Sequence, residues 1–365
     1  MSVAPVSSGL DGVVVAETVL SLVDGEAGEL IIRGARLPEL VADGGFEGAA
    51  ARLWQGLLPE GGNREGLLEA LGRARRDAFL ARYPESRAEG ARSPVETLRA
   101  ALAALADPAP APHLRIMGTA PVVVAAAVRA SRGLSPVAPD PSLTTAADFL
   151  RMLRGEVADL AEVAALDAYL TTVVDHGLNA STFTARVIAS TQAGLVSAVV
   201  GALCALQGPL HGGAPGPVLD MLDAVAAAGD ADAWIDAALA RGERLMGFGH
   251  RVYKVRDPRA DVLRQAAASL RRTAGRLALA ADVERAAVAA LARRKPGLRL
   301  DTNVEFYTAV LLEALGIPRD AFTAVFAIGR TAGWIAHARE QAETGRLIRP
   351  QSVYVGPPPA SVTRT

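Results

Sequence analysis

Apolar residues recur at three- and four-residue intervals along most of the chain, and this helical spacing most restricts the fold. Pro- and Gly-rich segments such as LPEGG, ADPAPAP and GLSPVAPDPS end the periodic stretches. Strand patterns are few, and VVVAETVLSLVDGEAGELIIRG predicts a short N-terminal β hairpin. We therefore expect an all-α protein with this hairpin. The predicted helices are 46–57, 64–82, 94–106, 119–133, 144–154, 158–174, 219–229, 230–241, 258–275, 280–293, 303–315 and 319–345.

The charge balance excludes binding partners that need a global electrostatic field. The chain has 365 residues, with 38 Lys and Arg against 39 Asp and Glu. A net charge of −1 attracts neither nucleic acid nor an anionic membrane, so an anion needs a local cluster of cations. The length suits one large or two unequal domains. The segment GPLHGGAPGPV at 208–218 separates two helical blocks and predicts a hinge or a domain boundary.

A single cysteine, Cys204, excludes intrachain disulfides and Cys-rich zinc sites and fits a cytoplasmic protein. The N-terminus has no basic residue before its apolar positions, which argues against a secretory signal. Residues 187–219 carry no charge, but polar residues, Gly and Pro interrupt them. We therefore expect a buried core helix and a loop there rather than a membrane span. In this apolar setting Cys204 is expected to be a buried, inert thiol.

Five histidines need individual consideration. His113 follows a Pro-rich loop and is expected at the surface, and His337 in GWIAHARE is expected to serve packing. His176, His211 and His250 stand at helix ends or in Gly-rich loops, where structural and functional interpretations stay open from position alone. Their separations of 35 and 39 residues match no metal-ligand motif, and neither Gly-rich segment fits a nucleotide fingerprint. We therefore expect no metal site.

Four segments in order, GPLHGGA, GFGHRVYKVRDPRA, NVEFYTAVLLEALGIP and FAIGRTAGWIAHAREQ, closely resemble the citrate synthase family. The likeness is to the bacterial short-chain type that includes 2-methylcitrate synthases, and it covers nearly the whole chain. It implies an all-α homodimer with a large domain formed by residues 1–214 and 319–365. A small domain at 215–318 would bind CoA and close over oxaloacetate, with a hinge in GGAPG at 212–216.

The resemblance also implies roles for individual residues. His211 corresponds to the histidine that stabilises the enol of the thioester, His250 to the one that activates the ketone, and Glu305 to the catalytic base. The implied substrate ligands are His176, Arg259, Arg330, Asn303, Phe326 and Arg349, the last supplied across the dimer. The implied CoA-binding residues are Gly247, Phe248, Gly249, Arg251, Lys254 and Arg256.

These residue types suit the implied reaction. A thioester α-carbon is a weak acid, so one group must remove its proton while a preorganised donor stabilises the charge on the carbonyl oxygen. Arg guanidinium groups bind the two carboxylates of oxaloacetate in a bidentate manner. The basic residues of the GFGH segment could bind the phosphates of CoA, although a solvated basic face is the alternative for each of them.

The sequence departs from the family pattern at three places near the expected site. Glu305 stands where most relatives have Asp, and the extra methylene moves the carboxylate by roughly 1 Å. GGAPGPV replaces GGANxxV, and Gly177 replaces the Glu of some relatives. The expected function is condensation of acetyl-CoA with oxaloacetate and hydrolysis of citryl-CoA, with no cofactor beyond the CoA thioester. Use of propionyl-CoA, use of another 2-oxo acid, and a silent CoA- or oxo-acid-binding paralogue remain alternatives.

Overall fold

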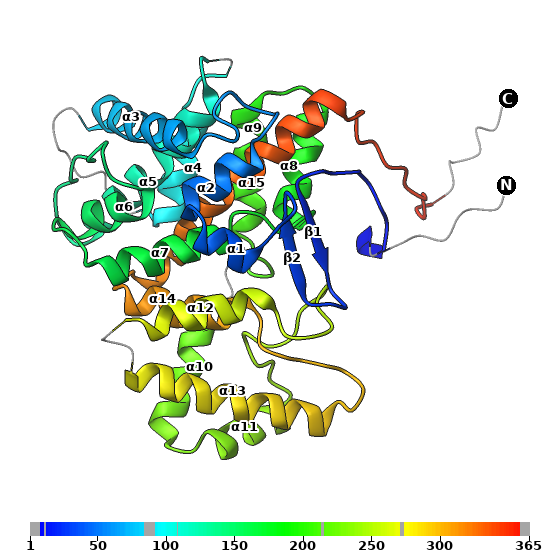
Figure 1. Cartoon of the computed structure of the whole chain (residues 1–365). Helices are drawn as coiled ribbons and strands as arrows, with labels where there is room; N and C mark the ends of the chain where they lie inside the picture. The colour runs from blue at the N-terminus through cyan, green and yellow to red at the C-terminus, as the bar shows by residue number, and fades with distance from the viewer. Residues whose placement is uncertain are drawn as a thin grey trace, which may run out of the picture.

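The computed structural model describes residues 8–10, 12–83, 92–107, 109–212, 215–270 and 274–357. These residues form fifteen α-helices and one small sheet, which confirms the all-α prediction (Figure 1). The helices are α1 (Leu37–Ala42), α2 (Gly45–Leu53), α3 (Arg64–Arg82), α4 (Pro94–Ala103), α5 (Pro112–Ser131), α6 (Thr145–Arg154), α7 (Leu160–Thr172), α8 (Ala180–Ser190), α9 (Leu195–Leu206), α10 (Pro215–Ala228), α11 (Ala231–Ala240), α12 (Pro258–Ala268), α13 (Ala274–Arg294), α14 (Val304–Ala314) and α15 (Phe322–Thr344).

Local capping explains where several helices begin and end. Thr144 caps α6 by accepting a hydrogen bond from the backbone of Ala147, and Gly155 ends this helix with a φ of 89°. Asp159 and Glu162 form a capping box at the start of α7. The predicted helix 64–82 coincides with α3, whereas α5 begins at Pro112 instead of at 119.

The uncharged stretch 187–219 was predicted as a buried core helix followed by a loop. A loop does follow α9, but the prediction of a single helix before it is wrong. α8 ends at Ser190 and α9 begins at Leu195, because Gln192 and Gly194 take positive φ values of 61° and 96° that no α-helix can include. Cys204 lies on an exposed side of α9, so its predicted burial is also wrong. Among the described residues, α5 is the one helix long and apolar enough to cross a membrane, and 67% of its most apolar window is buried inside the protein.

The N-terminal hairpin is present and is extended by a third strand. β1 (Ser21–Asp24) pairs antiparallel with β2 (Glu29–Ile32), with Asp24 opposite Glu29. β3 (Ala35–Arg36) pairs with the other edge of β2. The sheet lies beside the helical body and reaches toward the loop that precedes α12 (Figure 1).

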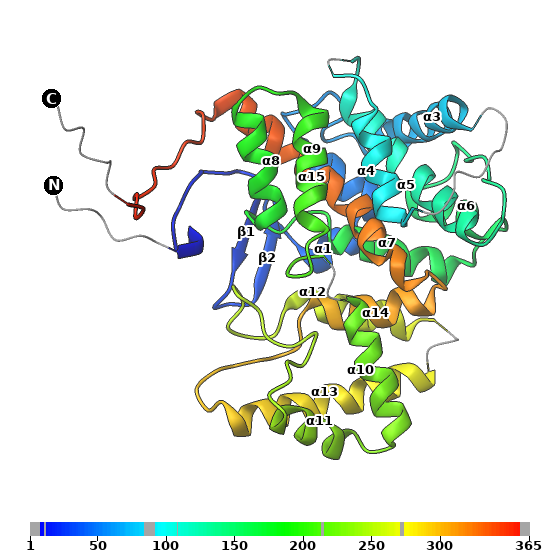
Figure 2. The same ribbon diagram turned by 180° about the vertical axis from the view of Figure 1, so that it is seen from behind.

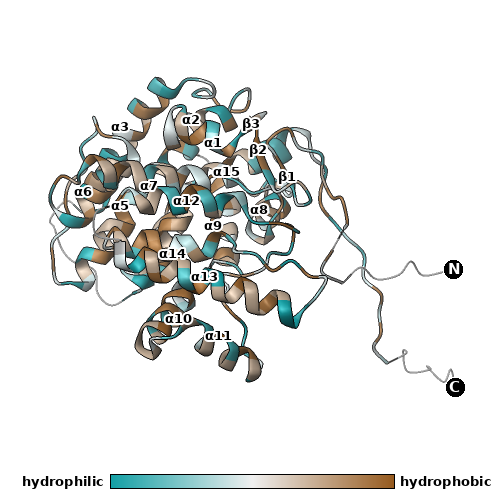
Figure 3. Cartoon of the chain, turned by 60° about the horizontal axis from the view of Figure 1, so that its bottom comes forward, coloured by the Kyte–Doolittle hydropathy of each residue, from teal (hydrophilic) through white to brown (hydrophobic). Residues whose placement is uncertain are grey.

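The long helix α15 forms the centre of the larger group of helices. It is buried along most of its length and packs against α2, α5, α7, α8 and α9. α10, α11 and α13 lie together at the opposite end of the molecule, with α12 and α14 between the two groups (Figures 1 and 2). In Figure 3 the ribbons of α9 and α14 near the middle are mostly apolar. The segment after α15 is not helical and leads away from the body beside the N-terminal segment (Figure 2).

Candidate active site

The candidate site is assembled from the larger group of helices, from α12 and α14, and from the loop before α12. His176 lies between α7 and α8, His211 follows α9, and His250 lies in the loop before α12. Arg259 stands in the first turn of α12 and Arg330 near the middle of α15. The structure brings these residues close enough that Arg259, Arg330 and the other two histidines all influence the charge state of His176.

Tyr253 joins two of the histidines. Its hydroxyl lies 3.1 Å from His176 Nε2, and its ring centroid lies 4.8 Å from that of His250. The rings of His176 and His250 meet edge to face at 5.5 Å, and the Arg259 guanidinium lies 5.8 Å above the Tyr253 ring. The sequence analysis did not single out Tyr253, although it stands within the quoted GFGHRVYK segment.

His250 and Arg259 present two hydrogen-bond donors to one space. The Nδ1 atom of His250 accepts from the backbone of Val252 at 3.0 Å and of Tyr253 at 3.1 Å, so the neutral ring carries its hydrogen on Nε2. Arg259 Nη2 lies 3.4 Å from this Nε2. Because both nitrogen atoms then donate, they do not form a hydrogen bond with each other. A ligand oxygen within hydrogen-bond distance of both atoms would accept from both of them.

Asp257 holds Arg259 in place. Its two carboxylate oxygens accept from Arg259 Nε at 3.0 Å and Nη2 at 2.8 Å, a bidentate ion pair that is almost completely buried. The same carboxylate accepts from the backbone of Val304 at the start of α14. Burial opposes the charge of Arg259, but Asp257 outweighs it and raises the arginine pKa.

Arg330, on α15, is buried against the C-terminal end of α7. Its Nε donates to the carbonyl of Val173 at 2.5 Å, and its guanidinium stacks 4.8 Å above the ring of Phe326. Burial lowers the pKa of Arg330 to about 10, although Asp175 opposes this shift. In the described part of the chain its Nη atoms have no hydrogen-bond partner, which leaves both available to an anionic ligand.

His211 is held by a buried serine. Its Nε2 lies 2.9 Å from Ser181 Oγ, which also accepts from the indole nitrogen of Trp334 at 3.1 Å. Asn179 lies 2.8 Å from the same hydroxyl and caps α8 through the backbone of Ser181 and Thr182. Ser181 was not among the predicted site residues, although it follows His176 closely in the sequence.

Glu305 occupies the first turn of α14 and keeps one carboxylate oxygen free. Asn303 caps the helix by accepting from the Glu305 backbone at 3.0 Å, and its Nδ2 donates to the carbonyl of Gly249 at 2.8 Å. Glu305 Oε2 is buried and has no hydrogen-bond partner among the described residues. Burial raises the pKa of Glu305 to about 7, although Arg259 and Arg330 oppose this shift. A buried carboxylate with a pKa near neutrality is suited to proton transfer.

The three site histidines are neutral at pH 7. Burial lowers the pKa of His211 to about 4, and Arg330 and Arg259 add to this effect. Burial and Arg259 likewise lower the pKa of His250 to about 4. The pKa of His176 falls well below its ordinary value for the same reasons. Neutral imidazoles beside positive guanidinium groups can donate hydrogen bonds without adding charge.

The residues predicted to bind CoA fall into two groups. Gly247, Phe248 and Gly249 pair with the segment before α14: Asn303 donates to Gly247, Phe248 forms a bridge with Thr302, and Gly247 and Gly249 take φ values of 85° and 77°. Arg251 and Lys254 are exposed, whereas Arg256 forms ion pairs with Asp261 at 2.8 Å and Glu284 at 2.5 Å. Arg256 is therefore held by carboxylates of its own chain.

Arg349 is exposed in the segment after α15, which leads away from the body of the chain (Figure 2). The structure thus does not bring it to the other predicted substrate ligands within this single chain. The predicted hinge at 212–216 includes residues 213 and 214, which lie outside the described residues.

The two remaining histidines have structural partners. His113 is buried, with its Nε2 2.9 Å from Glu60 and its ring at the edge of Trp54, so its predicted surface position is wrong. The residue that bonds it lies far away in sequence and is invisible to a local pattern. His337 is fully buried between Arg186 and Asp175, as expected for a packing role.

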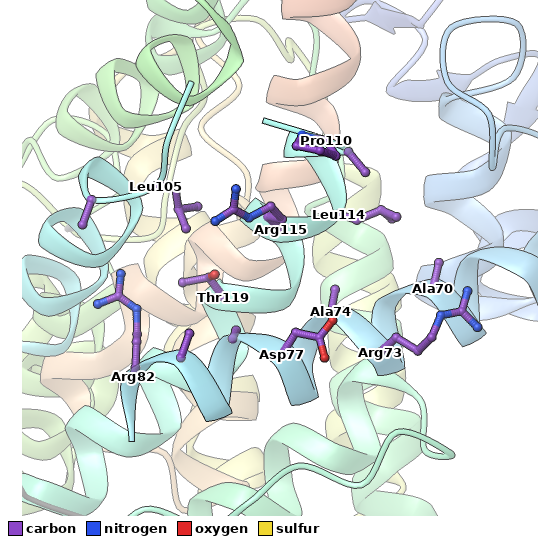
Figure 4. A pocket seen from close by; sticks show the side chains of 14 residues that line it. Ala70, Arg73, Ala74, Asp77, Arg82, Leu105, Pro110, Leu114, Arg115 and Thr119 are labelled. Carbon is purple, nitrogen blue, oxygen red and sulfur yellow. The ribbon is translucent and has the colours of Figure 1, made fainter. Parts of the chain in front are cut away.

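One cavity lies away from the candidate site in the part of the chain that the structure describes. In the described ranges, no group of three or more His, Cys, Asp or Glu side chains is arranged to hold a metal ion. A cavity of about 770 Å³ opens between α3 and the start of α5, lined by Arg73, Arg82, Arg115 and several alanines (Figure 4). None of the predicted site residues lines this cavity.

Comparison with known proteins defines the family. Residues 9–351 match the family described as "Citrate synthase, C-terminal domain", and the chain therefore belongs to the citrate synthase family. It is 40% identical over 369 residues to the citrate synthase of Haloferax volcanii, covering 95% of both chains. It is 36% identical over 371 residues to a 2-methylcitrate synthase of Mycobacterium tuberculosis, covering 96% of this chain and 91% of the relative.

Two further matches extend the comparison. A protein of Mycobacterium tuberculosis named putative citrate synthase 2 is 51% identical over 222 residues, and this match spans 61% of the present chain and 59% of the relative's length. Among solved structures, a ternary complex of a Thermoplasma acidophilum citrate synthase with carboxymethyl coenzyme A and oxaloacetate has a TM-score of 0.85. It is 28% identical and covers 97% of each chain.

Proposed function

We propose that this chain is a citrate synthase, which condenses acetyl-CoA with oxaloacetate and hydrolyses citryl-CoA to citrate and CoA. One observation carries the proposal. His250 Nε2 and Arg259 Nη2 are two hydrogen-bond donors that face the same space, and no described residue offers both of them a shared acceptor there. The buried Glu305 Oε2 has no hydrogen-bond donor among the described residues. A keto acid supplies the missing acceptor, and the thioester methyl group supplies a proton for the carboxylate.

The first step is enolisation. Glu305 Oε2 takes a proton from the methyl carbon of acetyl-CoA, and the electron pair of that C–H bond moves toward the thioester carbonyl oxygen. His211 Nδ1 donates to this oxygen in the proposed step, which requires the single hydroxyl hydrogen of Ser181 to turn from Asn179 Oδ1, its acceptor at 2.8 Å, to His211 Nε2 at 2.9 Å. In this proposal Ser181 fixes the histidine tautomer.

The second step forms the carbon–carbon bond. The enol carbon attacks the ketone carbon of oxaloacetate, whose oxygen accepts a hydrogen bond from Arg259 Nη2. As the π bond of the ketone opens, this oxygen takes the proton of His250 Nε2 and becomes the hydroxyl of citryl-CoA, and His250 regains a proton from the water that later attacks. Arg259 and Arg330 hold the two carboxylates and fix the face that is attacked. Water then adds to the thioester carbon of citryl-CoA, the C–S bond breaks, and CoA leaves as the thiol.

The proposal includes the organisation that the family resemblance implies. Residues 215–318 form a small domain that closes over oxaloacetate, and residues 247–256 hold CoA. Two copies of the chain form a dimer in which the exposed Arg349 of each copy reaches a carboxylate in the other site. Support comes from the segment after α15, which leads away from the helical body (Figure 2) and in which Arg349 is exposed.

Product analysis tests this function. Acetyl-CoA labelled with ¹³C at the methyl carbon is incubated with oxaloacetate and the purified chain, and the products are identified by NMR and mass spectrometry. We expect one labelled methylene of citrate for each CoA released. Unchanged acetyl-CoA in the presence of bound oxaloacetate would refute the enzyme proposal and favour a silent binding protein.

The acyl chain of the thioester is a separate question, because the chain also resembles a 2-methylcitrate synthase. Adding one methylene to a substrate changes discrimination by only about 1–3 kcal/mol. Values of kcat/KM for acetyl-CoA and propionyl-CoA with the same oxo acid decide it. A preference for propionyl-CoA would replace the acetyl assignment and leave the roles of Glu305 and His211 unchanged.

A further inference from the structure

The turn of the N-terminal hairpin lies against the loop that carries His250. The backbone nitrogen of Lys254 donates to the carbonyl of Gly25 at 2.8 Å. A Cβ atom on Gly25 would lie 2.2 Å from the carbonyl oxygen of Val252, so a glycine is needed for this approach. A Cβ on Gly28 would lie 2.6 Å from a methyl group of Val255.

The strand before this turn contacts the other histidine loop. Ser21 Oγ donates to Asp175 Oδ2 at 2.5 Å, and a methyl group of Val23 lies 3.3 Å from the place of a Cβ on Gly177. Asp175 and Gly177 flank His176 in sequence. A single element, residues 21–28, therefore touches the loops of both His176 and His250.

The turn itself is rigid. Asp24 Oδ1 accepts from the backbone of Glu26 at 3.0 Å and of Ala27 at 2.9 Å, which closes the turn between the paired ends of β1 and β2. At the other end of β1, the backbone of Val19 donates to Glu340 on α15 at 3.0 Å. The element is thus fixed to the larger group of helices and reaches across to the loop before α12.

We propose that residues 21–28, the hairpin strap, set the spacing between the His176 loop and the His250 loop and so position the oxo-acid site. Gly25 is a positioning residue that acts through the backbone of Val252 and Lys254. The strap matters because Tyr253, which lies between these two residues, bonds to His176 and packs on His250. This inference rests on the proposed function, in which both histidines contact oxaloacetate.

Gly25→Ala tests the strap with little change elsewhere. Its φ is not in the left-handed region, so the added methyl group meets Val252 without imposing backbone strain at residue 25. Relief of the contact must separate the turn from the loop by roughly 1 Å, a displacement that can cost about a hundredfold at a reacting centre. Gly275→Ala is the matched control, because Gly275 is exposed and a Cβ there meets nothing within 4 Å.

Hydrogen exchange, the two KM values and the melting temperature are measured on the full chain. Hydrogen exchange without ligand should be about two- to tenfold faster in Gly25→Ala than in the wild type at residues 250–257, as expected when one hydrogen bond is lost. The KM for oxaloacetate should rise about tenfold or more, with a smaller change in the KM for acetyl-CoA and an unchanged melting temperature. Gly275→Ala should match the wild type in exchange at residues 250–257 and in both KM values.

Unchanged exchange at 250–257 together with an unchanged oxaloacetate KM would overturn the inference. If Gly25→Ala melts at a lower temperature, the variant Asp24→Ala tests the strap instead. It removes the two hydrogen bonds that close the turn and introduces no steric clash. Faster exchange at 250–257 in that variant supports the strap, and wild-type exchange overturns it. Exchange needs no substrate, so a wild type that makes no citrate refutes the proposed function while the strap is still tested.

Discussion

Replacing Glu305 with Gln is expected to abolish turnover and at the same time to stabilise the folded chain. The amide keeps the shape of the side chain but cannot accept the proton of the thioester methyl group. General base catalysis contributes about 10²–10⁴-fold, so kcat should fall by roughly a thousandfold while oxaloacetate still binds.

The stability gain follows from the raised pKa. Burial raises the pKa of Glu305 from 4.5 to about 7, so the folded chain holds this proton more tightly than the unfolded chain does. Between these values the unfolded state is ionised first, and stability falls as the pH rises through the window. Above pH 7 the full penalty of roughly 3 kcal/mol is present, at about 1.4 kcal/mol per pKa unit. Gln carries no charge, so the variant does not have this destabilisation.

Urea unfolding of both proteins at pH 8.5 and pH 5 measures this difference. We expect Glu305→Gln to exceed the wild type in unfolding free energy by about 2–3 kcal/mol at pH 8.5 and by about 1 kcal/mol or less at pH 5. Turnover within tenfold of the wild type would refute Glu305 as the base. An equal stability gain at both pH values would refute the buried, titrating carboxylate.

Three further results are expected. In the wild type, kcat/KM should fall tenfold per pH unit below about pH 7, because protonated Glu305 cannot act as a base; a flat profile from pH 8 to pH 5.5 would contradict its pKa of about 7. Ser181→Ala should lower kcat by about 10–100-fold with little change in the oxaloacetate KM, because His211 Nε2 loses its partner; an effect confined to that KM would contradict the tautomer argument. Alkylation of the exposed Cys204 should go to completion in the native protein and leave kcat unchanged, and loss of activity would place this thiol in the mechanism.

Much of the fold was accessible from the sequence because helical periodicity is a local property. α3 was predicted at both ends, and the predicted helix 144–154 matches α6 to within one residue. The helix predicted at the start of 187–219, before the predicted loop, is interrupted because the apolar composition continues across Gln192 and Gly194, where the backbone turns out of the helix. Composition does not report the sign of φ at a residue such as Gln192.

The candidate site residues could be predicted only from their resemblance to the family's motifs. His176, His211 and His250 were left open by position alone, and the family segments drew attention to them. Tyr253 and Asp257 lie inside one of these segments, and Ser181 follows His176 closely in the sequence. All three were missed as functional residues, because a sequence pattern does not say which side chains of a loop turn inward. The hairpin strap was equally hidden, since its contacts join residues more than 150 positions apart, such as Ser21 and Asp175.

The central claim is that Glu305 makes this chain a carbon–carbon bond-forming enzyme, and release of free CoA tests it most directly. The purified chain is mixed with acetyl-CoA, oxaloacetate and a chromogenic thiol reagent, after the exposed Cys204 has reacted to completion. We predict continuous release of CoA that requires oxaloacetate and is lost in Glu305→Gln. No release by the wild type, or equal release by the variant, would contradict the account.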